Sequence, residues 1–218
     1  MKFAYLLAAA AAVAAVQPAY AKAGDILLRG RVIQVHPLED STDVLPAFPG
    51  EEVKVSNAWT LEVDGTYMVT DHIGFELIAA TTKHKVSGKS GTTGNIGKLA
   101  STWVLPPTLT AQYHFLPEGR IRPYVGAGIN YSLFYSEKAS DGLEDAVGDT
   151  DVELSDSFGP ALQAGVDVDV GNNLFLNLDV KWIDMDTTAK LHTEAIGRQK
   201  VKVHIDPLVF GVGIGTRF

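Results

Sequence analysis

The sequence contains no cysteine, so disulfide bonds, thiol nucleophiles and thiolate metal sites are all excluded. Basic residues are also scarce: 18 Lys and Arg stand against 26 Asp and Glu, which argues against a nucleic-acid partner. After residue 21 no apolar run approaches the roughly 20 residues that a membrane-spanning helix needs. A helical membrane protein is therefore excluded. A membrane β-barrel is not, because its strands alternate apolar and polar residues.

The first residues do contain a short apolar run. Lys2 precedes an alanine-rich stretch over 3–16, and Ala19-Tyr20-Ala21 is a small-x-small cleavage site. This pattern predicts a secretory signal peptide over 1–21, cleaved after Ala21, followed by one mature domain over 22–218. The alternative, a membrane anchor, is disfavoured because the run is too short to span a bilayer.

The mature chain alternates apolar and polar residues in segments separated by turns. In the clearest segment Trp59, Leu61 and Val63 share one face, and Thr60, Glu62 and Asp64 share the other. Alternation with a period of two is typical of β-strands. We predict strands near 25–36, 53–70, 73–86, 103–115, 121–135, 157–170, 174–186 and 201–218.

The connections between these segments alternate in length. Three are short, at 70–72, 116–120 and 171–173. Four are long and rich in Gly, Ser, Thr and charge, at 37–52, 87–102, 136–156 and 187–200. This is typical of bacterial barrels, with short turns and both termini on the periplasmic side and long loops outside. A weak pattern over 141–147 suggests a short helix in the third long loop.

The competing interpretation is a soluble β-sandwich, whose strands also alternate. Two features favour a barrel instead. Aromatic residues lie near the strand ends on the apolar face, as interfacial girdles do. The opposite face carries many charges, which is unusual for the inside of a sandwich. We therefore predict an all-β fold, an eight-stranded antiparallel transmembrane β-barrel, in which the sheet closes so that every backbone group finds a partner.

Several stretches resemble the outer-membrane protein W (OmpW) family. They are Thr81-Thr82-Lys83-His84, the run PPTLTAQYHFLPEGRIRPYVGAGINYSLFY over 106–135, DSFGPALQAGVDVDV over 156–170, LDVKWIDMDTTA over 178–189 and IDPLVFGVGIGTRF over 205–218. The resemblance covers almost the whole mature chain. It implies an eight-stranded barrel with an apolar lumen, which passes small hydrophobic molecules across the outer membrane of a Gram-negative bacterium and has links to envelope stress.

The chain departs from the family pattern at Pro160, Leu208 and Thr216. These departures affect the geometry of the wall and the interfacial anchoring, not the resemblance itself. The terminal Phe218 matches the C-terminal aromatic signature of such barrels. The resemblance therefore implies the barrel-assembly machinery as a partner, beside outer-membrane lipid and lipopolysaccharide.

The periplasmic half of the inward face is predicted to be charged. An eight-stranded barrel is only wide enough for side chains to fill it, so enclosed charges of both signs should pair and close the lumen. A purely structural role for this network is the favoured interpretation. Its main members are Arg29, Arg31, Glu62, Asp64, Glu76, Arg122, Asp167, Asp179, Lys181 and Arg217.

The outer half of the inward face is predicted to be apolar. Such a lumen either admits an apolar solute or is simply packed, and the residues alone do not separate the two; the family resemblance favours a ligand. The candidate lining residues are Ile33, Val35, Ile78, Val104, Phe134, Ile183, Met185, Val203, Ile205 and Val209.

A lumen closed below leaves a sideways exit into the bilayer. Pro106 and Pro107, Pro160 and Pro207 lie within predicted strands, where each removes a ladder hydrogen bond. Our hypothesis is that these prolines open a lateral gap. The equally good alternative is that they only end strand pairing at the rim.

No constellation of Ser, His and acid at convincing heights suggests an enzyme, and no ligand spacing suggests a metal or cofactor. We therefore expect a passive channel or carrier for small hydrophobic molecules. The alternative is a structural or receptor barrel whose external loops bind a phage, a bacteriocin or a host surface.

Overall fold

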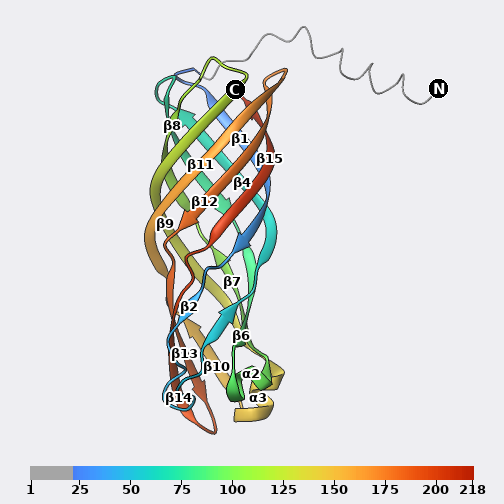
Figure 1. The fold of residues 1–218 in the computed structure, drawn as a ribbon, viewed down its shortest axis with the longest axis vertical. Coiled ribbons are helices and arrows are strands. Elements are labelled where there is room, and N and C mark those ends of the chain that lie inside the picture. The colour runs from blue at the N-terminus through green and yellow to red at the C-terminus, as the bar shows by residue number, and fades with distance from the viewer. Residues whose placement is uncertain (1–21) are drawn as a thin grey trace, which may run out of the picture.

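A computed structural model describes residues 22–218, and the signal peptide predicted over 1–21 lies outside the described residues. Eight antiparallel strands form a closed ring (Figure 1). They are β1 (Ile26–His36), β4 (Ala58–Met68), β5 (Ile73–Ala80), β8 (Thr108–His114), β9 (Ile121–Ala139), β11 (Ser157–Gly171), β12 (Leu174–Ile183) and β15 (Leu208–Arg217). Pairing of β11 with β9 and of β1 with β15 closes the ring. The predicted barrel is confirmed, and the sandwich is wrong.

Beyond the ring the wall continues as two separate sheets. The first contains β3 (Val53–Val55), β6 (Thr82–Gly88), β7 (Lys98–Leu105) and the outer end of β9. The second contains β10 (Thr150–Leu154), β13 (Asp186–Thr193), β14 (Gly197–His204) and β2 (Asp40–Ser41). Within residues 22–218 no ladder joins the two sheets. On one side the Ser41 hydroxyl bridges them, because it accepts from Val53 N at 3.0 Å and lies 3.3 Å from Val53 O.

The short turns lie at the end of the barrel that carries the C-terminus, as predicted (Figure 1). The opposite end carries the helices α2 (Gly91–Ile96) and α3 (Asp141–Val147). The short helix predicted over 141–147 is thus confirmed. Its first turn is capped by Ser140, whose hydroxyl oxygen accepts from Leu143 N at 3.2 Å.

The predicted extents of the long loops need correction. Most of 187–200 forms the hairpin of β13 and β14, and β7 begins at Lys98, inside the predicted loop over 87–102. Alternation does continue there, but charged residues take the place of apolar ones on the outward face. The strand prediction relies on the contrast between an apolar outward face and a polar inward face. Above the membrane the outward face is charged, so the predicted strands end before the real ones do.

Burial alternates strictly along the ring strands. The inward residues of β1 are buried, and the outward residues of the ring form an apolar band in which Leu61 is 71% exposed. Such a band is what a bilayer covers. Gly213 and Gly215 face inward, and a Cβ on them would collide with Arg31 and Phe175 respectively, so these glycines make room in the lumen. No helix among residues 22–218 is long and apolar enough to span a membrane.

Glu51 holds the start of α2 in place outside the ring. Its carboxylate accepts from Thr92 N at 2.9 Å and from Thr93 N at 2.7 Å. Hydrogen bonds from the side chain and backbone of Thr93, then from the backbone of Thr92, lower the pKa of Glu51. A carboxyl whose folded pKa is depressed contributes stability above its unfolded pKa and loses it as pH falls through the folded value.

We therefore expect the amides of Thr92 and Thr93 to lose hydrogen-exchange protection as the pH falls below the ordinary glutamate range, about 4. The Glu51→Gln variant should show the weaker protection already at neutral pH, without further change on acidification. Protection that is independent of pH in the unmodified chain would contradict this role for Glu51.

Candidate functional site

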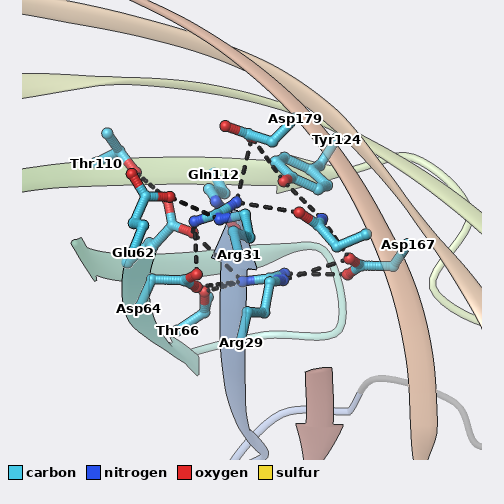
Figure 2. Close-up of polar contacts among 12 residues, drawn as sticks. Arg29, Arg31, Glu62, Asp64, Thr66, Thr110, Gln112, Tyr124, Asp167 and Asp179 are labelled. Atoms are coloured by element: carbon cyan, nitrogen blue, oxygen red, sulfur yellow. Dashed lines mark hydrogen bonds and ion pairs between the residues drawn. The ribbon is translucent and has the colours of Figure 1, made fainter. Parts of the chain in front are cut away.

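The periplasmic half of the lumen is filled by an ion-pair network centred on two arginines of β1 (Figure 2). Arg29 is fully enclosed. Its Nη1 lies 2.9 Å from Asp64 Oδ1 and donates to Thr66 Oγ1 at 2.8 Å, and its Nη2 lies 3.0 Å from Asp167 Oδ2. One guanidinium thus ties β1 to β4 and β11 across the barrel. Strands far apart in the ring are joined through its centre.

Arg31 lies one step higher and completes a second layer (Figure 2). Its Nε is 2.7 Å from Glu62 Oε1, and its Nη2 is 3.1 Å from Glu76 Oε1. Lys181 joins the same layer, because its Nζ lies 2.8 Å from Glu62 Oε1 and 2.6 Å from Asp179 Oδ1. Buried charges are tolerated only with such partners, so these pairs act together.

Neutral polar side chains satisfy the remaining oxygens of the network. Tyr124 donates its hydroxyl to Asp179 Oδ2 at 2.8 Å, and Gln163 Nε2 donates to the same oxygen at 2.9 Å. Asn177 Nδ2 donates to Asp167 Oδ1 at 2.8 Å. Beneath the network Leu27, Met68 and Phe175 form a small buried apolar cluster. The lumen is therefore packed closed toward the periplasm.

Two of the predicted network residues lie at its edge or outside it. Arg122 is buried lower in the lumen, with Nη1 at 3.4 Å from Asp169 Oδ2 and its guanidinium over the Phe175 ring. Arg217 is a correction: its Nε lies 3.5 Å from Asp25 Oδ2, and its Nη2 donates to Asn173 at the periplasmic rim. Arg217 occupies the last strand position, where the lumen opens to water. The structure brings the other eight predicted residues together.

An apolar cavity of about 80 Å³ occupies the outer half of the lumen. All ten predicted lining residues face it, and Glu62 and Lys181 of the network form its floor. Further lining residues lie outside the predicted set: some belong to segments predicted as loops, and the others lie at the outer ends of predicted strands, beyond the positions assigned to the lumen. They include Val53, Val55, Thr82, His84, Val86, Thr102, Leu154, Thr187, Ala189 and Val201.

The wall beside this cavity is interrupted at Pro106 and Pro107. The ladder of β5 and β8 ends at Ile78 opposite Thr108, and the ladder of β6 and β7 starts at Thr82 opposite Val104. The intervening segments, 79–81 and 105–107, are not paired with each other, although Ala79 and Ala80 pair with β4 and Leu105 pairs with β9. Across them Thr81 Oγ1 donates to Val104 O at 3.2 Å. The cavity lining reaches this interruption through Ile78, Ala80, Val104 and Pro106.

The other face of the same proline pair is sealed. Asn130 on β9 donates from Nδ2 to Pro106 O at 3.1 Å and to Pro107 O at 3.3 Å, and Tyr131 N donates to Pro107 O at 3.1 Å. The proline pair therefore separates β7 and β8 from the strands before them, not from β9.

The remaining two prolines do not open the wall, which corrects the predicted set. Pro160 is exposed, stays in register opposite Ile129, and accepts from Asp184 N at 2.9 Å. Pro207 lies at a second interruption, but hydrogen bonds bridge it: Pro207 O accepts from Ile183 N at 3.3 Å, and Ile205 N donates to Met185 O at 2.8 Å. A proline removes one donor, and at both places neighbouring groups keep the edges joined.

Three carboxylates converge near this second interruption. Asp184, Asp186 and Asp206 each place an oxygen within 4.8 Å of the others. Asp206 also accepts from Met185 N at 3.0 Å, and Asp186 Oδ1 lies 2.7 Å from His204 Nδ1. These local bonds account for the positions of the three carboxylates. Among residues 22–218 this is the one group of side chains whose spacing could hold a metal ion.

Comparison with known proteins supports a single family. A sequence model described as the OmpW family matches residues 22–218. Outer membrane protein W of Escherichia coli is 38% identical over 199 residues, covering 90% of each chain. Outer membrane protein AlkL of Ectopseudomonas oleovorans is 29% identical over 175 residues, covering 79% of this chain and 71% of the relative. The crystal structure of OprG from Pseudomonas aeruginosa superimposes with a TM-score of 0.85 at 32% identity, covering 94% of this chain and 99% of that one.

Proposed function

Because this chain belongs to the OmpW family and is an outer-membrane β-barrel of the same type as OprG and AlkL, we propose that it is a non-enzymatic carrier for small hydrophobic molecules. Solutes are taken up passively from the outside, occupy the apolar cavity, and leave sideways into the outer membrane. The proposal also assigns the cavity residues, from Ile33 to Val209, the role of contacting the solute.

The observation that carries the proposal is the continuity between the cavity and the wall interruption, where segments 79–81 and 105–107 are not paired with each other. The surface of the cavity is mainly apolar, which suits a small apolar ligand. Its floor is the ion-pair network, which an apolar solute does not cross, because separating buried charges is costly. The wall interruption is therefore the favoured way out.

The direct test measures uptake of a radiolabelled apolar compound by cells that lack the gene, with and without the gene restored. A polar compound of similar size is the control. We expect the restored gene to speed uptake of the apolar compound alone. Equal rates for both strains would contradict transport, and equal acceleration of both compounds would indicate a water-filled channel instead.

A proline substitution tests the lateral route. In the double variant Pro106→Val, Pro107→Val both positions regain a backbone N–H and a β-favouring side chain, so the ladder should extend across the interruption. We expect apolar uptake to fall several-fold.

The matched control for that variant is Pro160→Val, which changes a proline within a continuous ladder and should leave uptake unchanged. If cells carrying the Pro106→Val, Pro107→Val variant take up the apolar compound as fast as cells carrying the Pro160→Val variant, the lateral exit is excluded, whereas binding of the solute in the apolar cavity is not.

A further inference from the structure

The outward face of the β13–β14 hairpin gathers basic side chains. Cross-strand register places Lys190 opposite Lys200, and His192 opposite Arg198. Lys202 follows on the same face. We call Lys190, Arg198, Lys200 and Lys202 the basic cluster; all four are exposed. Ten of the chain's basic residues lie in the outer half, and only here do two of them face each other across a ladder.

Like charges directly opposite on a ladder are destabilising, because their Cβ atoms are only about 5 Å apart. The other lysines of the outer half stand opposite uncharged or aromatic residues, or have a carboxylate partner, as Lys89 has in Glu52. Within residues 22–218 no residue of the basic cluster has a carboxylate within ion-pair distance. This holds even though Glu153 stands opposite Lys190 on the neighbouring strand β10. One facing carboxylate does not balance four cations, so the basic cluster keeps a net positive charge that an anion outside the chain can neutralise.

The cluster also borders an open hollow on the surface. Lys190, Arg198 and Lys200 line this hollow together with His192, Gln199 and one carboxylate, Glu153, and Leu45 and Pro46 form its apolar side. The hollow is held rigidly, because Leu45 and Lys200 exchange backbone hydrogen bonds of 3.1 and 2.8 Å. A fixed concave site with cations on one side and hydrocarbon on the other fits a phosphorylated glycolipid better than a small free anion.

Its height identifies the source of such a ligand. Trp182 is an outward aromatic residue at the end of the apolar band, and Lys190 lies eight residues further along the chain. Eight residues of strand span about 26 Å, which places Lys190 about 20 Å above the band once strand tilt is taken into account. This height exceeds the roughly 8–10 Å over which anionic headgroups at the membrane surface attract basic segments, so the ligand must carry its phosphates above that surface. The outer-leaflet lipopolysaccharide places its phosphorylated inner sugars in this layer.

We propose that the basic cluster is a binding site for the phosphorylated inner core of lipopolysaccharide. The phosphates take the position between Lys190 and Lys200 and relieve their repulsion, and Arg198 and Lys202 extend the contact along the hairpin. This site is separate from the apolar cavity, because the side chains of the cluster point away from the lumen.

The test measures binding of purified inner-core lipopolysaccharide to the folded mature protein in nanodiscs. For the double variant Lys190→Glu, Lys200→Glu we expect at least tenfold weaker binding. The control variant Lys54→Glu, Lys98→Glu makes the same charge change on the other sheet, where both lysines stand opposite Ser87, and should stay within twofold. Each variant is first checked for folding by its gel shift on heating. If the glutamate variant does not fold, Lys190→Gln, Lys200→Gln replaces it.

Two further arms identify the ligand and the physical cause. Phosphatase-treated lipopolysaccharide should bind the unmodified chain about tenfold more weakly, and millimolar inorganic phosphate should not compete. Without ligand, Lys200→Thr should raise the unfolding midpoint, because it removes the repulsion from Lys190. Equal binding by the Lys190→Glu, Lys200→Glu variant, or full competition by inorganic phosphate, would overturn the proposal.

Discussion

Replacing Arg31 by methionine is expected to destabilise the barrel by about 3–5 kcal/mol, the usual loss when one partner of a buried charge network is removed. Arg31 contacts carboxylates from three strands: Glu62 and Asp64 on β4, Glu76 on β5 and Asp179 on β12. Methionine keeps much of the side-chain volume, so the expected loss comes from the charge. The carboxylates left behind would face one another with only Arg29 and Lys181 to compensate them.

The measurement is the free energy of unfolding in urea, with the protein folded into lipid vesicles and followed by tryptophan fluorescence. Arg217→Met is the matched control, because it removes the same group from a partly exposed pair at the rim and should cost less than about 1 kcal/mol. Similar losses of unfolding free energy for Arg31→Met and Arg217→Met would contradict the idea that burial makes the network important for stability. Glu62→Gln combined with Arg31→Met should recover part of the loss.

Introducing a charge into the apolar cavity is expected to reduce uptake of apolar compounds at least tenfold. Ile205→Glu places a carboxylate among Val203, Val209 and Ile183, where water would have to accompany it. An apolar solute passing this point must then displace that water. A penalty of only 1.4 kcal/mol corresponds to tenfold.

The volume-conserving variant Ile205→Leu should transport normally and is the control. Comparing Ile205→Glu with Ile205→Leu also distinguishes a carrier from a receptor barrel, the two functions that the sequence leaves open. A receptor barrel would bind its external partner equally well in both variants, because position 205 faces the lumen. Normal uptake by a folded Ile205→Glu barrel would remove the cavity from the transport route.

The ring and both halves of the lumen follow from sequence because alternation reports directly which residues share a face. Ile33, Phe134 and Val209 come from strands far apart in the chain, yet each was assigned inward by its neighbours alone. The contrast between a charged lower half and an apolar upper half survives any small error in strand ends, since it depends on several residues of each strand.

What the sequence does not reveal is set by groups outside the alternating pattern. Pro160 and Pro107 cannot be distinguished by residue type alone. Pro160 stays within a continuous ladder, whereas Pro107 borders the interruption between the β5–β8 and β6–β7 ladders. The difference depends on which neighbouring strand supplies the missing bonds. The hairpin of β13 and β14 was hidden for another reason: its outward lysines belong in water, so the contrast that marks a lipid-facing strand is lost there.

The division of the outer wall into two sheets affects how large a solute the protein accepts. The radius of the ring is fixed by its eight strands and their stagger. The two outer sheets are each rooted in that ring but share no ladder. Ser41 contacts Val53 on one side, and Phe134 N donates to Asp156 on the other. We therefore expect the width of the cavity to change by movement of the two outer sheets, while the hydrogen bonds of the ring stay intact, so that solutes of different size can share one route.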